Sequence, residues 1–217
     1  MPKLRIVVAD DHPLMRRGIA DLLETEPGWE VVAEASNGRE AVDAVAKTKP
    51  DVLVIDLSMP ELNGLTATRE ILRFFPKVEV VLLTIHNTDQ AIREVLESGA
   101  RGYVLKSDAG QDLITAVKAV SVGKPFFTPN VAEVVLKGYL GRNAKAPLKE
   151  DLPQLTTRER QVVQLLAEGK GNKDVAVTMQ VSVKTVEAHR SNINRKLSIR
   201  STSDLVRYAV RNGIVEL

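Results

Sequence analysis

The chain of 217 residues contains no cysteine, which excludes disulfide bonds and thiolate metal sites and fits the reducing cytoplasm. Aromatic residues make up only 4% of the sequence. No stretch approaches the ~20 consecutive apolar residues of a transmembrane helix, so we expect no contact with the membrane. The three histidines, His12, His86 and His189, are far apart in sequence. We expect each to be a surface or packing residue rather than a metal ligand.

Two common catalytic motifs are also missing, the phosphate-binding loop Gly-x-x-x-x-Gly-Lys-Ser/Thr and the nucleophile elbow Gly-x-Ser-x-Gly. What is present is an uneven distribution of charge. Residues 1–124 hold 15 Lys+Arg and 19 Asp+Glu, a net charge of −4, whereas residues 125–217 hold 15 Lys+Arg and 9 Asp+Glu, a net charge of +6. The contrast favours two domains, of which the basic second one is typical of proteins that bind a polyanion.

Four apolar runs in the first half are each followed by, or end in, polar residues. Helix-like patterns lie between them, and a further strand is expected from Trp29 to Glu34. Alternating strands and helices predict an α/β domain with a doubly wound, five-stranded parallel sheet of the flavodoxin-like type. The runs and their polar residues are 4–9 with Asp10 and Asp11, 52–55 with Asp56, 78–83 with Thr84, and 102–105 with Lys106; the helical patterns are 12–25, 38–47, 62–74 and 88–97.

The carboxyl ends of parallel strands meet at one edge of a sheet, where open α/β sheets place their chemistry. Three carboxylates would repel one another there unless a cation such as Mg2+, which prefers oxygen ligands, joins them. Asp56 could then attack phosphorus as a nucleophile, while Thr84 and Lys106 hold the phosphoryl oxygens. Taken alone, an aspartate that ends a strand can equally be the cap of the next helix.

The same residues make positions 1–122 resemble a response-regulator receiver domain, together with Met59-Pro60, Asn63-Gly64 and Tyr103. The resemblance implies that Asp56 accepts a phosphoryl group from a sensor histidine kinase. It implies a Mg2+ site made by Asp11, Asp56 and the backbone carbonyl of Ser58, with Asp10 in an outer position or acting through water. It also implies a switch in which Tyr103 rotates into space that Thr84 vacates. Ser107 departs from the proline that many receivers have after the lysine.

Glycine and proline punctuate residues 123–153, which we expect to form a linker. Within it, Pro129 to Tyr139 is helix-like and could pack on either domain or serve as a hinge. Residues 154–217 predict four helices that contain a helix-turn-helix. The first begins with a capping box of Thr156 and Glu159. The other expected N-caps are Asn172, Ser182, and Thr202 or Ser203, and the expected helix ends are Gly169, Met179, Leu197 and Gly213.

The third of these helices is expected to turn an apolar stripe inward, formed by Val183, Val186, Ile193 and Leu197. The whole stretch from Leu155 to Tyr208 resembles the LuxR-type helix-turn-helix of NarL/FixJ-class regulators. The resemblance is carried by Leu155–Glu159, Leu165–Gly169, Asn172–Ala176, Thr185–His189 and Lys196-Leu197. It implies base contacts by Glu187, Ala188 and Ser191, and phosphate contacts by Lys184, Thr185, His189, Arg190 and Arg195.

Glu187 stands where some relatives carry lysine, and a glutamate can accept a hydrogen bond from cytosine N4 but repels phosphates. Together the two resemblances imply a two-component response regulator rather than an enzyme. On phosphorylation it would form a homodimer, with contacts through the last helix at 203–212, and bind double-stranded promoter DNA. A contact with RNA polymerase stays open.

Two alternatives remain. An aspartyl-phosphate hydrolase would need a second acid two residues after the nucleophile, and Ser58 occupies that position. A DNA-binding regulator that works without phosphorylation is the other, and the complete set of receiver residues argues against it.

Overall fold

The computed structural model describes residues 3–85, 89–128, 131, 155–212 and 214–215. The chain divides into two compact units, Met1–Tyr139 and Leu140–Leu217. None of the helices in the described ranges combines the length and the apolar character needed to cross a bilayer.

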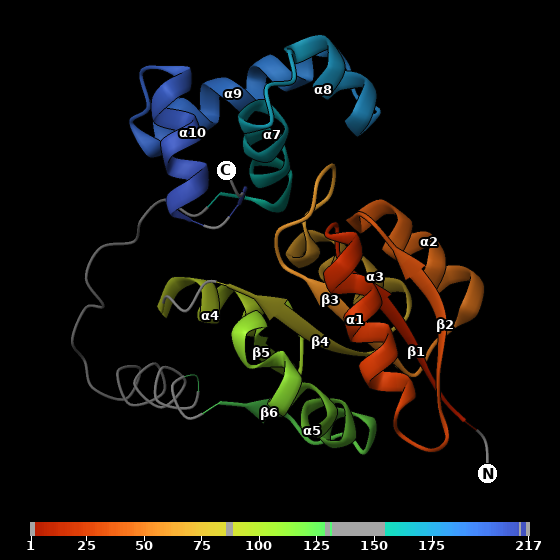
Figure 1. The fold of residues 1–217 in the computed structure, drawn as a ribbon. Helices are drawn as coiled ribbons and strands as arrows, with labels where there is room; N and C mark the ends of the chain where they lie inside the picture. The colour runs from red at the N-terminus through yellow and green to blue at the C-terminus, as the bar shows by residue number, and fades with distance from the viewer. Residues whose placement is uncertain (1–2, 86–88, 129–130, 132–154, 213, 216–217) are drawn as a thin grey trace. The chain divides into compact units, whose positions relative to one another are not determined.

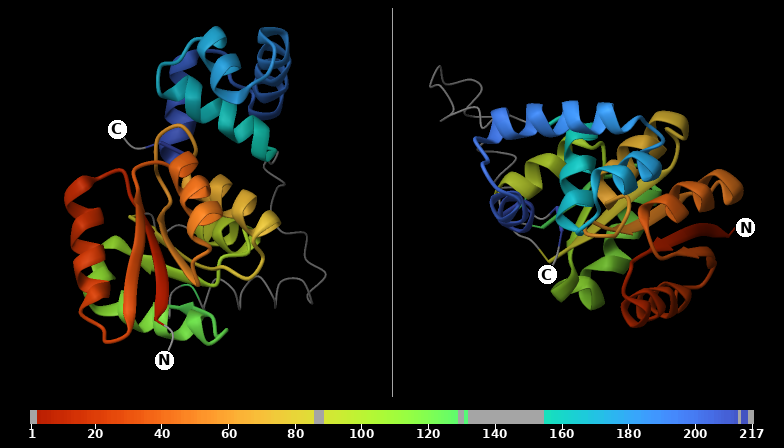
Figure 2. Two further views of the ribbon diagram at one scale, coloured as in Figure 1. Left: turned by 90° about the vertical axis from the view of Figure 1, so that its right-hand side faces the viewer. Right: turned by 90° about the horizontal axis from the view of Figure 1, so that it is seen from above.

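The first unit is a parallel sheet in the order β2-β1-β3-β4-β5-β6, with helices on both of its faces (Figures 1 and 2). The five expected strands all form, and the connections are the predicted helices. In chain order the elements are β1 Leu4–Ala9, α1 Pro13–Glu24, β2 Trp29–Ala35, α2 Gly38–Thr48, β3 Val52–Asp56, α3 Gly64–Phe74, β4 Glu79–Thr84, α4 Asp89–Glu97, β5 Gly102–Leu105, a 3-10 turn Lys106–Asp108, α5 Ala109–Ser121 and β6 Phe126–Phe127.

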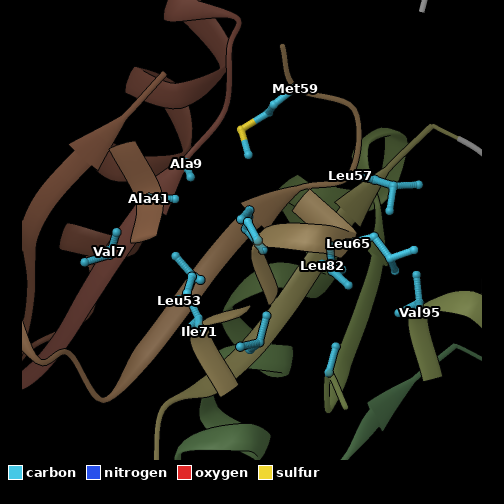
Figure 3. Packing of buried hydrophobic residues seen from close by; sticks show 14 of the residues in the cluster. Val7, Ala9, Ala41, Leu53, Leu57, Met59, Leu65, Ile71, Leu82 and Val95 are labelled. Carbon is cyan, nitrogen blue, oxygen red and sulfur yellow. The ribbon is translucent and has the colours of Figure 1, made fainter. Parts of the chain in front are cut away.

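The strands are apolar throughout because both faces of the sheet are covered, so every residue of β3 is buried. Alternate residues enter two separate cores. Leu53 and Leu82 pack on one face with Ile71 of α3 (Figure 3). Val54 and Leu83 pack on the other face with residues of α1 and α5, among them Leu23 and Leu113.

Polar caps fix where the helices of this unit begin. The side chain of Asn37 accepts a hydrogen bond from the backbone N–H of Glu40, and that of Asn63 accepts one from the N–H of Thr66. Pro13 occupies the first position of α1, where a missing N–H costs nothing. Asn63 lies between β3 and α3, so this cap also fixes the chain directly after Asp56.

The expected number of strands was one too low, because β6 lies in the segment assigned to the linker. Its Phe126 donates a backbone hydrogen bond to the carbonyl of Arg101 at 2.9 Å, and the strand runs parallel to β5. A strand of two residues is too short to show any periodicity. The helix expected at 129–139 falls outside the described residues except for Val131, which is buried in the core on the α3 face of the sheet.

The second unit contains the four expected helices, α7 Thr157–Ala167, α8 Asn172–Met179, α9 Val183–Leu197 and α10 Thr202–Arg211. The capping box of Thr156 and Glu159 forms as predicted, and Ser182 caps α9. Apolar residues from all four helices make one core, which includes Val163, Val175, Val186, Ile193 and Leu205.

Three details of this unit differ from the expectation. Gly171 is the N-cap of α8, and Asn172 is its first helical residue. Ser201, not Thr202 or Ser203, caps α10, and its hydroxyl accepts a hydrogen bond from the N–H of Asp204 at 3.1 Å. Val183 does not point inward, because as the first residue of α9 it lies at the end of the stripe, and it remains 37% exposed.

Candidate functional site

A cluster of charged side chains lies at the carboxyl edge of the sheet, at the point where the strand order reverses. Asp10 follows β1 and Asp56 ends β3, and these two strands are neighbours with Ala9 opposite Ile55. Both carboxylates are fully buried. Crevices of doubly wound sheets form at this switch point, so the fold alone brings the two acids together.

Lys106 joins these two carboxylates. Its Nζ lies 3.0 Å from Oδ2 of Asp10 and 2.9 Å from Oδ2 of Asp56, and its side chain is only 8% exposed. Burial on its own disfavours the ammonium, but the attraction of Asp56 and Asp10 outweighs it and raises the pKa of Lys106 above its ordinary value. Lys106 is therefore charged at neutral pH and can neutralise negative charge next to Asp56.

Asp10 is held by contacts on each of its oxygens. Oδ1 accepts a hydrogen bond from the backbone N–H of His12 at 2.8 Å, and Oδ2 pairs with Lys106. Its backbone carbonyl accepts from Nη1 of Arg16 at 2.7 Å, while Nε of Arg16 pairs with Glu34 at 3.2 Å. Sequence reasoning missed Arg16, which carries no motif and is identified only by this contact.

His12 is exposed, as expected for a surface histidine, but it also lies beside the acidic cluster. Its Nδ1 lies 2.9 Å from Oδ1 of Asp11 and 3.4 Å from Oδ1 of Asp10. One ligand atom from each of Asp10, Asp11, His12 and Asp56 lies within 4.8 Å of all the others, so the four could hold a metal ion. The signal available in the sequence was the position of the histidine directly after the acidic pair.

Thr84 and Tyr103 are both buried near this edge. Asp56 is in register with Leu83, so Thr84 stands one position beyond it on the neighbouring strand. Tyr103 is the largest fully buried side chain among the described residues, and burial raises its pKa to about 12. The exchange of Tyr103 with Thr84 on phosphorylation stays a prediction.

The loop after Asp56 passes very close to the backbone of that residue. The N–H of Gly64 donates to the carbonyl of Leu57 at 2.9 Å, and a Cβ at position 64 would lie 1.9 Å from the carbonyl oxygen of Asp56. Only glycine permits this approach. The buried residue Ser58, whose carbonyl is the expected third metal ligand, lies on the same loop two positions after Asp56.

The second unit presents one polar face of α9 to solvent. The residues at this face follow a helical spacing, and none of them belongs to the core. The exposed members are Lys184, Glu187, Ala188, Ser191 and Arg195. A protruding helix with lysine and arginine on its outer side has the shape and charge that the major groove admits.

Three further residues expected at DNA already contact other parts of the protein or lie half-buried. Nη1 of Arg190 donates to Oδ1 of Asn172 at 2.7 Å, which ties α9 to the start of α8. The hydroxyl of Thr185 lies 2.8 Å from that of Ser182, and His189 is half-buried.

Comparison with known proteins assigns each unit to a family. Residues 6–118 match the response regulator receiver domain, and residues 153–209 match the bacterial regulatory proteins of the luxR family. The chain is 36% identical to the transcriptional regulatory protein DegU of Brevibacillus brevis, over 99% of this chain and 96% of DegU. It is 37% identical to the oxygen regulatory protein NreC of Staphylococcus epidermidis, over 98% of this chain and all of NreC.

Solved structures of the response regulator RcsB from Salmonella typhimurium are similar along the whole chain. One, described in terms of conformational dynamism for DNA interaction, has 28% identity and a TM-score of 0.71, and covers 98% of this chain and 99% of its own. An RcsB–DNA complex has 29% identity and a TM-score of 0.59, with 97% of this chain and 98% of that chain covered.

Proposed function

Because this chain belongs to the response regulators that join a receiver domain to a LuxR-family DNA-binding domain, we propose that Asp56 is its phosphoacceptor. As a member of that family it regulates transcription by binding DNA and is not an enzyme. We assign the receiver domain to residues 1–122, the linker to 123–153 and the DNA-binding domain to 154–217, with the first part of the linker adding β6 to the receiver sheet. The phosphoryl donor is the phosphohistidine of a sensor histidine kinase. We place the protein in the cytoplasm, where it meets both the kinase and DNA.

The observation that carries the proposal is the position of Asp56 beside both Lys106 and the acidic pair at the switch point of the sheet. An oxygen of Asp56 attacks phosphorus as the bond from phosphorus to the donor nitrogen breaks. Lys106, charged and already 2.9 Å from Asp56, pairs with the phosphoryl oxygens. The hydroxyl of Thr84 donates a hydrogen bond to one of them.

The carboxylates also fit a magnesium ion. The carboxylates of Asp10, Asp11 and Asp56 lie close together and would repel one another unless a second cation, in addition to Lys106, lies among them. Asp11 and Asp56, with the backbone carbonyl of Ser58, would bind Mg2+ directly. Asp10 would act through water, since both of its oxygens already have protein partners. When bound, the ion neutralises charge on the acids and on the phosphoryl group.

In the DNA-binding domain we propose that α9 enters the major groove. Glu187, Ala188 and Ser191 contact bases, while Lys184, Thr185, His189, Arg190 and Arg195 contact phosphates. Phosphorylation favours a homodimer on a two-fold related DNA site, because Tyr103 repacks as Thr84 turns toward the phosphoryl group. Since the phosphate contacts release counterions, the affinity for DNA falls steeply with salt.

The test is a phosphate-affinity gel after incubation with Mg2+ and acetyl phosphate, run in parallel with a DNA gel-shift on a duplex that phosphorylated wild type selects from a random library. We expect a retarded band and tighter DNA binding for the wild type, and neither for Asp56→Asn. Asp43→Asn, a change at an exposed aspartate of α2, is the matched control and behaves as the wild type.

Two results would contradict the proposal. Phosphorylation of Asp56→Asn at the rate of the wild type would exclude Asp56 as the acceptor. Equal DNA affinity of treated and untreated wild type, with Asp56 phosphorylated, would instead show a regulator whose receiver does not control DNA binding.

A further inference from the structure

We infer that His12 is a nitrogen ligand at the metal site of the receiver, so that the site accepts a borderline divalent cation such as Co2+, Ni2+ or Zn2+ as well as Mg2+. The inference rests on the proposed metal site and adds a residue that an all-oxygen magnesium site does not use. Three observations support it: the separation of the donor atoms, the rigidity of the backbone at His12, and the exposure of the imidazole.

The first observation is the separation of the donor atoms. Two ligand atoms that each bind an ion at about 2.1 Å are about 3.0 Å apart across an octahedral edge, or about 3.4 Å across a tetrahedral one. Nδ1 of His12 is 2.9 Å from Oδ1 of Asp11 and 3.4 Å from Oδ1 of Asp10. The imidazole and Asp11 can therefore share one ion with little movement of their side chains, while Asp10 stays outside the direct ligands.

The second observation is that the backbone at His12 is fixed. Its N–H donates to Oδ1 of Asp10 at 2.8 Å, and its carbonyl accepts the first hydrogen bond of α1 from the N–H of Arg16 at 2.9 Å. Pro13, which follows, restricts the conformation further. The rotation of the side chain is then the main freedom left, so little entropy is lost when Nδ1 binds an ion.

The third observation is exposure. The side chain of His12 is 59% exposed, while that of Asp11 is 30% exposed and those of Asp10 and Asp56 are buried. An ion arriving from water meets the imidazole and Asp11 first. The site is open on this side, which leaves room for water molecules to complete the coordination.

Ligand chemistry then determines which ions gain from His12. Imidazole suits Zn, Ni and Co, whereas Mg2+ prefers oxygen and gains little from nitrogen. With a metal, the tautomer that carries the proton on Nε2 leaves the lone pair of Nδ1 free for the ion.

The experiment is calorimetric titration of the full chain with Mg2+ and with Co2+, on the wild type, His12→Ala and a control, Asp43→Ala, at an exposed position of α2. We expect His12→Ala to weaken Co2+ binding at the site by about tenfold and Mg2+ binding by less than about threefold. The control leaves both affinities unchanged. Proton NMR of the Co2+ form gives a second readout, since a coordinated imidazole shows a strongly shifted N–H signal that His12→Ala lacks and Asp43→Ala retains.

The outcomes separate this inference from the proposed function. Equal Co2+ affinity in the wild type and His12→Ala, with Mg2+ still bound, overturns the role of His12 alone. Tighter binding of both ions in His12→Ala also overturns it, because the imidazole would then compete with the metal. If Mg2+ does not bind the wild type, the proposed metal site itself fails.

Discussion

Glu159 shows how a single buried side chain can connect two helices of the DNA-binding unit, α7 and α9. Its Oε2 accepts hydrogen bonds from the N–H of Thr156 at 2.8 Å and from Nζ of Lys196 at 2.7 Å, with its own side chain 5% exposed. Burial alone would raise the pKa of Glu159, but the hydrogen bonds from Lys196 and Thr156 together lower it below 4.5. The ionised carboxylate therefore stabilises the folded unit.

Glu159→Gln tests this stabilisation, because glutamine keeps the cap but loses the charge. We expect the unit to lose roughly 1–3 kcal/mol at pH 7. Since the folded pKa is lowered, the contribution is complete above the ordinary pKa and is lost as pH falls through the lowered one. The difference from the wild type should therefore disappear in acid. Urea unfolding followed by circular dichroism at several pH values checks it.

Glu187→Gln is the matched control for this change, since Glu187 is exposed on α9 and its substitution should change stability little. The fluorescence of Trp29, the single tryptophan, reports only the receiver unit and should be the same in all variants. A stability difference between wild type and Glu159→Gln that persists unchanged below pH 3 would contradict the role of the charge.

At the scale of elements, the connection from β3 to α3 determines the geometry around Asp56. We expect Gly64→Ala to destabilise the receiver by about 1–3 kcal/mol and to slow phosphorylation, because the new Cβ would meet the carbonyl oxygen of Asp56 at 1.9 Å and the loop must shift. Urea unfolding followed by Trp29 fluorescence gives the stability, and the phosphate-affinity gel gives the rate.

Gly18→Ala is the matched control for this element. Gly18 lies inside α1 with nothing within 4 Å of the added methyl group, so we expect it to stabilise the receiver by about 0.5–1 kcal/mol. If both alanine variants were equally stable and equally phosphorylated, the close approach at Gly64 would matter neither for the stability of the receiver nor for its phosphorylation.

For the whole molecule, the dimer that we propose for the phosphorylated protein has a candidate surface on α10. An open groove there is lined by Thr202, Ser203, Val206, Arg207, Val210 and Arg211. Val206 and Val210 supply apolar area for a contact between two copies of the protein. Arg207 and Arg211 carry like charges, which the two copies must keep apart when they associate. This is the helix that the sequence assigned to dimer contacts.

Val206→Lys adds a third positive charge to this groove. We expect it to raise the dimer dissociation constant of the phosphorylated protein at least about tenfold, equivalent to about 1.4 kcal/mol, without unfolding the domain. Sedimentation measures this constant. Val122→Lys, at a 69% exposed valine of the receiver, is the control and should not change it. If Val206→Lys dimerised with the dissociation constant of the wild type, the dimer interface would have to lie elsewhere.

The sequence by itself determined the first five strands, the helices between them, the four helices of the second unit and the order of the chemistry along the chain. Apolar runs that end in Asp56, Thr84 and Lys106 predict strands, because residues covered on both faces must all be apolar. Short-range hydrogen bonds likewise predicted the cap at Thr156, since donor and acceptor lie three residues apart. Signals of this kind are local and can be read without knowing the fold.

Only the tertiary structure decided which side chains meet. Lys196 and Glu159 are separated by 37 positions, and Arg190 and Asn172 by 18, so no local pattern pairs them. The strand β6 exists because β5 offers it a partner, and its two residues have no periodicity of their own. His12 contacts Asp10 and Asp11 because it directly follows them in the chain, whereas only the packing of β1 beside β3 brings Asp56 to the same cluster.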